Sequence, residues 1–258
     1  MPYEEHEAFT NLPDHTVVWR YMDLSKFQKI IESKALWFAR TDKFDDKLEG
    51  TLTNTDQCKE KARRLLEEKF AKPWALTDNT IISKLPLHMG VNCWHINDTE
   101  NPRMWEEYVK DKEGIAIQST FGNLKASIID NDTVYFGKVK YIDYDLGQID
   151  ESNYLNYFLH KKKIDFEWES ELRGIIFKEP PYKTEGLYTK PDYTQVPFEY
   201  GKCIEVDFKK LIQNIYVKPG STPEFYRHLD EILQTHGFKD QFTIIPSKLQ
   251  FGSFLNQE

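Results

Sequence analysis

The sequence predicts a single α+β domain over residues 1–258, built from mixed, largely antiparallel sheets with flanking helices. Short runs of β-branched and aromatic residues alternate irregularly with amphipathic segments of helical period. Hydrophobic residues make up 40% of the 258 residues, which is enough for a sizeable core. No internal repeat, low-complexity tract or linker divides the chain, so one folding unit is the simplest interpretation.

Local patterns place the elements of the first half of the chain. Leu24, Phe27, Ile30 and Ile31 recur at helical spacing between two apolar runs, which predicts a strand, a helix and a second strand. Asn101 and Pro102 are typical of a helix N-terminus, with the asparagine as cap and the proline at the first position. The expected order is strand 16–21, helix 23–34, strand 35–40, loop 43–50, charged helix 55–70, irregular 71–90, strand 91–96, helix 101–109 and strand 114–120.

The second half of the chain is predicted in the same way. Thr222 and Gly237 mark the start and the end of an amphipathic helix, and Pro223 occupies its first turn. Strand, helix and strand over 202–246 belong to the same unit as the rest of the chain. The expected order in this half is a helix from about residue 123, strand 134–144, helix 150–163, strand 166–178, an irregular excursion 179–200, strand 202–208, the capped helix and a closing strand 241–246.

Composition narrows the classes of function. The formal net charge of -8 argues against non-specific binding to nucleic-acid backbones, which depends on an excess of lysine and arginine. Three widely separated cysteines are typical of a reducing compartment. The N-terminal residues have no apolar run, and no stretch approaches the length of a membrane span. We therefore expect a cytoplasmic protein without a membrane partner.

The segment FEWESELR, residues 166–173, is the most informative one for chemistry. If it is a strand, Glu167, Glu169, Glu171 and Arg173 share one face because strand side chains alternate. One interpretation is a solvated edge strand with a charge ladder that Arg173 and lysines neutralise. The other is a carboxylate pair in a cleft, which could stabilise an oxocarbenium-like centre and orient an attacking group.

Two further positions are candidates for ligand contacts. Arg20 lies in an apolar strand, where a guanidinium needs an anionic partner, either a carboxylate at the edge of the core or the phosphate of a ligand. Tyr21 beside it could stack on a flat ring or pack in the core. Ser119 and Thr120 end a strand, where a hydroxyl most often caps the following helix and could alternatively hold a ribose.

Metal sites receive little support from the sequence. His88, Cys93 and His95 have no second Cys/His pair nearby, so we expect no metal centre. The acidic cluster Asp45, Asp46 and Glu49 would suit Mg²⁺ in a phosphodiester-cleaving enzyme. We favour an ordinary acidic loop whose carboxylates accept hydrogen bonds from nearby backbone amides.

Read together, several short motifs resemble a bacterial family known as domain of unknown function 2971, over about residues 15–246. Two departures stand out. Lys47 replaces a proline that is usual in the family, and Cys93-Trp94-His95 stands where the family tends to have Ser-Phe-Ser. The motifs that carry the resemblance are Trp19-Arg20-Tyr21, Leu36-Trp37-Phe38, Phe44-Asp45-Asp46-Lys47-Leu48-Glu49, Trp105 with Tyr108, Gly114-Ile115-Ala116-Ile117, Val139-Lys140-Tyr141 and Trp168-Glu169-Ser170-Glu171-Leu172-Arg173.

A looser similarity adds a function. The order of an arginine on a first strand, Ser-Thr on a middle strand and Glu-x-Glu late in the chain is similar to that of mono-ADP-ribosyltransferases. By that resemblance, Glu171 would contact the nicotinamide ribose of NAD, and Glu169 would orient or deprotonate the acceptor. Arg20, with Tyr21 beside it, would hold an NAD phosphate, and Ser119 or Thr120 would position the ribose or Glu171.

The resemblance implies an ADP-ribosyltransferase-like core and an enzyme that cleaves the nicotinamide–ribose bond of NAD without a metal. The acceptor could be a protein, a nucleic acid or water, and by analogy the role could be that of a toxin or a phage-defence effector under an antitoxin or regulatory protein. The alternative is a non-catalytic binding or regulatory module, in which Glu169, Glu171 and Arg173 form a structural ion-pair network.

Overall fold

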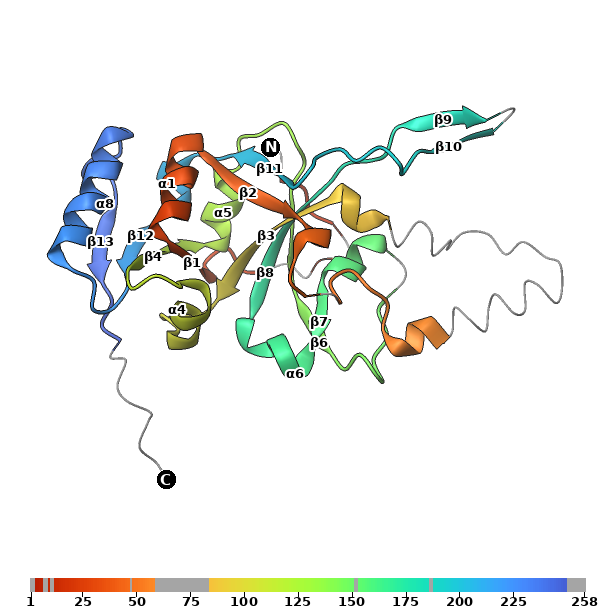
Figure 1. The fold of residues 1–258 in the computed structure, drawn as a ribbon, viewed down its shortest axis with the longest axis horizontal. Helices are drawn as coiled ribbons and strands as arrows, with labels where there is room; N and C mark the ends of the chain where they lie inside the picture. Colours follow the sequence, from red (N-terminus) through yellow and green to blue (C-terminus); the bar gives the residue numbers. More distant parts are fainter. Residues whose placement is uncertain are drawn as a thin grey trace, which may run out of the picture.

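The structure is a computed structural model, and its ribbon is shown in Figure 1. It describes residues 3–6, 9, 12–46, 48–58, 84–150, 153–185 and 188–249. Residues 54–58 are helical, and the rest of the helix expected over 55–70 lies outside the described residues, as does Lys47. No helix in the described part of the chain has the length and the apolar character needed to cross a membrane.

A mixed sheet of nine strands forms the centre of the described fold. All of its strand pairs are antiparallel except the pair of β12 and β13, so the sheet is largely antiparallel as the sequence predicts. The strands are β1 Val17–Asp23, β2 Ala35–Arg40, β3 Met89–Ile96, β4 Gly114–Thr120, β5 Tyr135–Lys138, β8 Glu171–Phe177, β11 Gly201–Glu205, β12 Asn214–Val217 and β13 Thr243–Pro246.

Helices flank this sheet, and several begin at the caps that the sequence indicates. The side chains of Asn101, Thr120 and Thr222 each accept a hydrogen bond from a backbone amide in the first turn of α4, α5 and α8, respectively. The α-helices are α1 Leu24–Ser33, α4 Pro102–Tyr108, α5 Phe121–Ser127, α6 Lys163–Phe166, α7 Phe208–Leu211 and α8 Pro223–Thr235. Short 3₁₀ helices are η1 Thr41–Lys43, η2 Leu85–His88, η3 Tyr154–Phe158 and η4 Glu167–Glu169.

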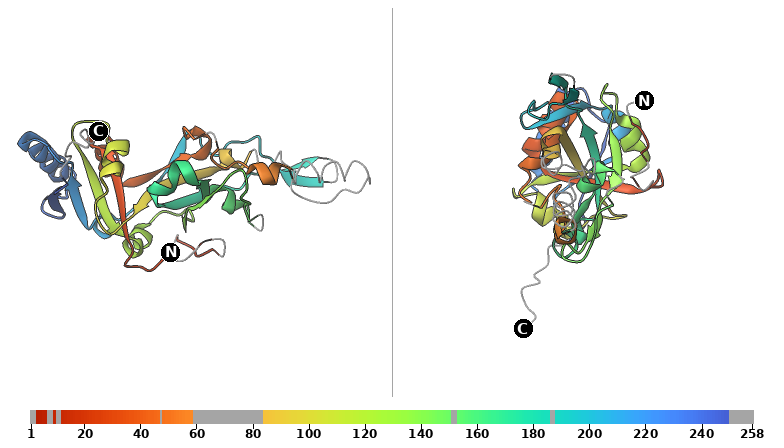
Figure 2. Two further views of the ribbon diagram at one scale, coloured as in Figure 1. Left: turned by 90° about the horizontal axis from the view of Figure 1, so that it is seen from below. Right: turned by 90° about the vertical axis from the view of Figure 1, so that its right-hand side faces the viewer.

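Two small sheets lie outside the central one. β6 Lys140–Ile142 pairs in parallel with β7 His160–Lys162, and β9 Tyr182–Glu185 pairs with β10 Tyr188–Pro191. The β9–β10 pair and α8 lie at opposite ends of the long axis of the molecule (Figures 1 and 2).

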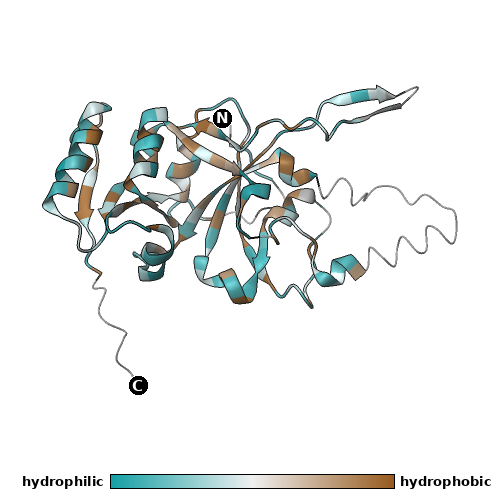
Figure 3. Cartoon of the chain, viewed as in Figure 1, coloured by the Kyte–Doolittle hydropathy of each residue, from teal (hydrophilic) through white to brown (hydrophobic). Residues whose placement is uncertain are grey.

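Many of the aromatic residues form part of the core. Trp19, Trp94 and Trp105 are among the largest fully buried side chains, together with several phenylalanines. Figure 3 shows hydrophobic residues along the strands of the central sheet, whereas the helices carry hydrophilic residues on their outer sides. Burial of large apolar surface is the main stabilising term in such a core.

One edge of β3 is shared by two strands, and this arrangement creates the site described below. β8 pairs with β3 from Met89 to His95 and therefore occupies one whole edge. β2 pairs with the other edge at Gly90 and Val91, and β1 pairs with that same edge at His95 and Ile96. Among the described strands, residues 92–94 consequently have no partner on that edge, and β1 and β2 diverge on either side of them.

Several expected elements differ from the structure. The strand expected over 166–178 begins only at Glu171, because η4 and a left-handed turn at Ser170 (φ 41°) precede it. Glu167 and Glu169 therefore do not share a strand face with Glu171 and Arg173. β8 also pairs with both β3 and β5, so it is not the solvated edge strand that a charge ladder would require.

Other differences concern short elements with weak patterns. The strand expected over 134–144 is two strands, β5 and β6, that belong to different sheets. The helix expected over 150–163 consists of η3 followed by β7, and the strand expected over 202–208 ends at Glu205, before α7 begins. The excursion 179–200 contains β9 and β10, and β12 was not predicted because its four residues are too few for a clear alternation.

We expect Gly174→Ala to destabilise the fold. A Cβ at this position in β8 would lie 2.8 Å from a ring carbon of Phe136 and 3.1 Å from one of Phe38, and both rings are buried. Overpacking of this kind typically costs about 1–3 kcal/mol. Urea unfolding measures the loss, and Gln234→Ala on the exposed side of α8 serves as the control, with a change within about 0.5 kcal/mol. An equal stability of the two variants would contradict the packing described here.

Candidate functional site

A cavity of about 470 Å³ opens where β1 and β2 diverge from β3, and we call it the fork pocket. Its walls come from these three strands and β8, from the 3₁₀ helices η1 and η4, and from α1, α4, α6 and β7. The aromatic lining consists of Trp19, Tyr21, Trp37, Phe44, Trp94, His95, Tyr108 and Phe166. The charged lining consists of Arg20, Lys26, Lys43 and Lys161 and of Asp45, Asp46, Glu169 and Glu171.

The structure therefore brings four of the predicted site residues, Arg20, Tyr21, Glu169 and Glu171, to one concave pocket. Arg20 and Glu171 are about 150 residues apart in sequence, a separation read from their numbers, so tertiary structure alone brings them together. Both residues line this pocket, as we expect, but their side chains leave the sheet on opposite faces. Trp19 lies opposite His95 and His95 opposite Glu171, so Arg20, next to Trp19, points to the other face. The expected roles of Arg20 and Glu171 toward NAD stay predictions.

Arg20 is a cation without a partner among the described residues. Neither a hydrogen bond nor an ion pair joins its side chain to the described part of the chain, and its Nη1 atom is buried. The guanidinium lies over the ring of Trp94, 5.9 Å from the ring centroid. Burial lowers the pKa of Arg20 to about 10, so the group stays charged at neutral pH in surroundings that disfavour the charge.

Glu171 lies at the opposite wall in a buried ion-pair network, which consists of Glu49, Lys161, Glu169, Glu171 and Arg173. The carboxylate of Glu171 accepts hydrogen bonds from Nε and Nη2 of Arg173 at 2.8 and 3.2 Å, and Lys161 Nζ lies 3.4 Å away. Burial would raise the pKa of Glu171, but the charges of Arg173 and Lys161 outweigh burial and hold this pKa at about 2. Glu171 is therefore ionised throughout the physiological pH range.

Arg173 is the centre of this network and has no exposed surface. It forms a bidentate pair with Glu49, a second one with Glu171, and a hydrogen bond from Nη1 to the carbonyl oxygen of Phe158 at 2.7 Å. All five N–H donors of the guanidinium are thereby used. The three carboxylates of the network outnumber its two cations, so the network retains one formal negative charge beside the pocket.

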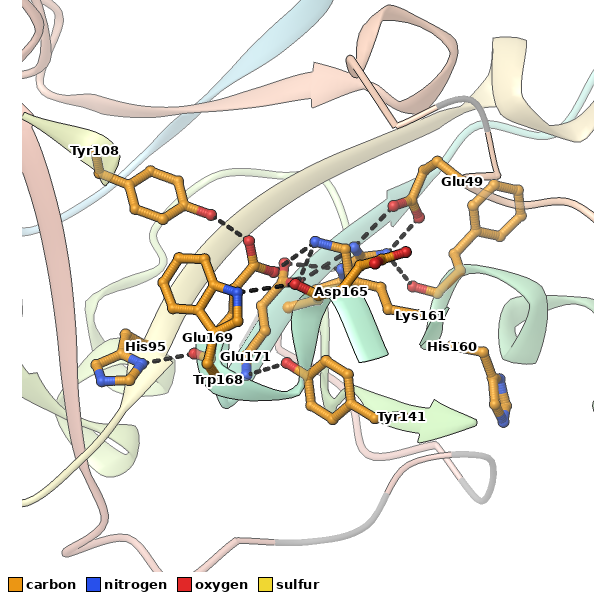
Figure 4. Close-up of polar contacts among 12 residues, drawn as sticks. Glu49, His95, Tyr108, Tyr141, His160, Lys161, Asp165, Trp168, Glu169 and Glu171 are labelled. Carbon is orange, nitrogen blue, oxygen red and sulfur yellow. Dashed lines mark hydrogen bonds and ion pairs between the residues drawn. The ribbon is translucent and has the colours of Figure 1, made fainter. Parts of the chain in front are cut away.

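Glu169 joins the network from η4 and not from a strand. Its two carboxylate oxygens accept hydrogen bonds from the Tyr108 hydroxyl and from Lys161 Nζ, each at 2.6 Å (Figure 4). Burial and the neighbouring Glu169 carboxylate raise the pKa of Tyr108, so its hydroxyl stays protonated and donates. The left-handed Ser170 reverses the chain between Glu169 and Glu171, which lets both carboxylates approach Lys161 from different directions.

His95 holds this turn in place. The Oδ1 atom of Asn101 accepts from the backbone amides of Arg103 and Met104, so its Nδ2 faces His95 Nε2 as a donor at 3.3 Å. Nε2 is therefore the acceptor, and Nδ1–H donates to the carbonyl oxygen of Glu169 at 2.6 Å. Burial lowers the pKa of His95, although the hydrogen bond to Glu169 partly opposes this effect, and the neutral tautomer fits both contacts.

Cys93 is a protonated thiol and not an activated nucleophile. The register of β3 and β8 sets Cys93 opposite Arg173 and His95 opposite Glu171, so these four side chains share one face of the sheet. Burial and the carboxylate of Glu171, with which the thiol forms a hydrogen bond, raise the pKa of Cys93 well above its usual value. The thiol therefore contributes a hydrogen bond to Glu171 and little nucleophilicity.

Ser119 and Thr120 do not reach the fork pocket. The Ser119 hydroxyl is buried and donates to the carbonyl oxygen of Leu211 at 2.5 Å, which ties β4 to the end of α7. Thr120 caps α5 by accepting from the amide of Asn123. The structure thus supports the capping interpretation of this segment and gives no support to contacts of either hydroxyl with a ribose in this pocket or with Glu171.

The carboxylates of the acidic cluster Asp45, Asp46 and Glu49 have different partners. Both oxygens of Glu49 bind Arg173, and Asp46 Oδ1 accepts from the backbone amide of Leu48 at 2.9 Å. Asp46 thus fits the expected loop that caps backbone amides, whereas Glu49 does not, because its carboxylate is buried in the ion pair with Arg173. Within the described part of the chain, no three His, Cys, Asp or Glu side chains converge as a metal site would require.

Two residues of the site were missed by the sequence reasoning. Lys161 pairs with both Glu169 and Glu171, yet the sequence analysis placed it only within an expected helix, 150–163. Tyr108 was noted only as part of the family resemblance. Tyr108 lies in the last turn of α4, one helical turn after the buried Met104. This local pattern does not indicate that the Tyr108 hydroxyl contacts Glu169.

We expect Arg173→Met to lower the free energy of unfolding by about 3–5 kcal/mol, because it leaves Glu49 and Glu171 buried without their main counter-ion. Denaturant unfolding monitored by circular dichroism is the measurement. The matched control is Arg227→Met, which removes an exposed Arg–Glu pair on α8 and should change stability by less than about 1 kcal/mol. Similar losses in both variants would refute the central position of Arg173 in the fold.

We expect the stability of the fold to decrease below neutral pH. Burial lowers the pKa values of His95 and His160 below the usual 6.5, so the unfolded chain takes up their protons first as pH falls. The free energy of unfolding should therefore decrease from pH 7 toward pH 5, by at most about 1.4 kcal/mol per pH unit for each histidine.

His95→Gln should reduce this slope, whereas the exposed His228 on α8 provides a control, His228→Gln, that retains it. Unfolding curves at several pH values between 5 and 7 measure both slopes. A wild-type stability that does not change over this range would contradict the neutral state of the buried histidines.

Comparisons with known proteins add no further guide to the site. Neither the family models, nor the curated proteins, nor the solved structures contain a match to this chain. The interpretation of the fork pocket therefore rests on the geometry and the charges described above.

Proposed function

We propose that the fork pocket binds NAD and that the protein cleaves its nicotinamide–ribose bond, as an ADP-ribosyltransferase or NAD glycohydrolase with an ADP-ribosyltransferase-like core. The observation that carries this proposal is the unpaired Arg20 guanidinium on one wall of an aromatic pocket whose other wall holds two buried carboxylates. An arginine with a purely structural role is expected to pair with an acceptor group of the protein. An arginine that binds the phosphate of a ligand does not need such a partner within the protein.

The distribution of charge suits this ligand. Arg20, Lys26 and Lys43 line the pocket on β1, α1 and η1, and they offer a pyrophosphate its counter-ions. Glu169 and Glu171 belong to a network with one net negative charge, which would stabilise the positive charge that develops on the ribose. The aromatic side chains between them provide faces on which flat rings can stack.

The chemical step needs little from the protein beyond orientation and charge. The bond from the ribose C1′ to the nicotinamide nitrogen breaks, and its electron pair leaves with neutral nicotinamide. The oxocarbenium-like ribose, stabilised by Glu171, is then attacked by the oxygen or nitrogen of an acceptor. The proton of that acceptor passes to the carboxylate of Glu169, which must exchange one of its present hydrogen bonds for it.

The acceptor is a protein, a nucleic acid or water. By analogy with enzymes of this kind, the biological role would be that of a toxin or phage-defence effector controlled by an antitoxin or another regulatory protein. This part of the proposal rests on the resemblance of the Arg, Ser-Thr and Glu-x-Glu order. Ser119 and Thr120 lie outside the pocket, so the Ser-Thr motif no longer supports this resemblance.

A non-catalytic binding module is the second candidate, and one observation favours it. Both oxygens of Glu169 and both oxygens of Glu171 already accept hydrogen bonds from protein groups, as a purely structural network would require. In that case the pocket would bind an anionic, flat ligand through Arg20 without chemistry at the carboxylates.

Arg20→Met tests the proposal without disturbing the ion-pair network. We expect the Kd of the variant for NAD to rise at least about tenfold, because the substitution removes at least one charge-assisted hydrogen bond to the ligand. Its melting temperature should stay equal to that of the wild type or rise, because the substitution removes a partly buried charge that has no partner among the described residues. Isothermal titration calorimetry and thermal unfolding measure the two effects.

Arg227→Met on α8 is the control and should bind NAD as the wild type does. A wild-type protein that does not bind NAD would overturn the proposal. A wild type that binds NAD but releases no nicotinamide, whether water, a protein or a nucleic acid is offered as the acceptor, would favour the binding module. A marked loss of stability in Arg20→Met would return Arg20 to a structural role.

A further inference from the structure

A second cavity, of about 730 Å³, adjoins the fork pocket beside α1, and we call it the α1 cavity. Four residues line both cavities, namely Arg20, Lys26, Ile30 and Trp37. A ligand held by Arg20 can therefore extend into either one. The charged groups along the α1 cavity are Arg20, Lys26 and Lys29, against the single carboxylate Glu32.

Trp37 stands at the junction of the two cavities and is unusually exposed for its position. The neighbouring Leu36 and Phe38 on β2 are fully buried, whereas Trp37 is 42% exposed, so its ring lies on the face of the strand opposite the core. The ring rests against Gly201 of the adjacent strand β11, where an added Cβ would lie 2.7 Å from ring atom Cζ2. Contact with this backbone restricts the ring, which is therefore held ready for a flat ligand.

The positive groups on this side are available to an anion. Lys26 has only a marginal ion pair with Asp23, at 4.0 Å, and Glu32 accepts a hydrogen bond from Gln28. An exposed indole flanked by cations is the combination that binds a base together with its phosphate. The four carboxylates of the fork pocket, by contrast, do not line the α1 cavity.

We infer that the α1 cavity is a nucleotide subsite, in which Trp37 stacks on a purine base and Lys26 and Lys29 contact the attached phosphate. The inference rests on the proposed NAD-cleaving function and specifies it. The ligand would span Arg20, with its nicotinamide ribose in the fork pocket and its adenosine phosphate half beside α1. Trp37 then selects ligands with a purine half over ligands that lack one.

Calorimetric titration with AMP and with nicotinamide mononucleotide, used separately, tests this assignment. Trp37→Ala should raise the Kd for AMP about tenfold or more, as expected for the loss of one base–aromatic stack, and change the Kd for nicotinamide mononucleotide much less, because Trp37 only borders the fork pocket. Trp37→Phe should retain most of the AMP affinity because it keeps an aromatic face. Tyr182→Ala, at an exposed position in β9, is the matched control and should change neither constant.

Lys29→Glu, at an exposed position on α1, provides a second variant should Trp37→Ala fail to fold, and it should weaken AMP binding through the phosphate. The inference is overturned by a wild type that does not bind AMP, or by Trp37 and Lys29 variants that bind AMP normally. Equal weakening of both probes by Trp37→Ala would also overturn it. A wild type that binds AMP through Trp37 but does not cleave NAD would remove the proposed function and leave the nucleotide subsite standing.

Discussion

Complete pairing of the Arg173 guanidinium is the constraint on which this structure depends. A guanidinium without exposed surface can stay charged only if each of its donors finds an acceptor, because the free energy of transferring an unpaired charge from water is prohibitive. Arg173 meets this condition with Glu49 from the loop after β2, with Glu171 from its own strand and with the carbonyl of Phe158. Segments more than one hundred residues apart are thereby joined at one point.

The position of this cluster follows from the split edge of β3. β8 covers one edge completely, while β1 and β2 share the other edge and then diverge. Asn92 bridges part of the gap, since its Nδ2 donates to the carbonyl oxygen of Trp37 and its Oδ1 accepts from the Trp94 indole. The remaining space is the fork pocket, so the sheet topology itself opens a cavity beside Glu171 and Arg20.

The sequence allowed much of the fold to be predicted, and the site only in part. Long amphipathic patterns with caps, such as the helix after Thr222, determine their own structure locally. Strand alternation placed Glu171 and Arg173 on one face correctly, but it failed for Glu169, where tertiary contacts from His95 and Lys161 favour a 3₁₀ turn over a strand. The position of the Ser119 hydroxyl depends on Leu211, 92 residues away, and no local pattern encodes such a contact.

Two arginines in this chain differ in how completely the described residues pair them. Arg173 is saturated by protein groups, and its pKa is raised by Glu171 and Glu49 well above the usual value despite complete burial. Arg20 is buried at Nη1 without any described partner, and burial alone lowers its pKa to about 10. Carboxylates that could pair with Arg20 are present in the fork pocket, because Asp45, Asp46 and Glu169 line it together with Arg20. None of them pairs with Arg20, and this lack of a partner among the described residues is the observation on which the proposed binding of an anionic ligand rests.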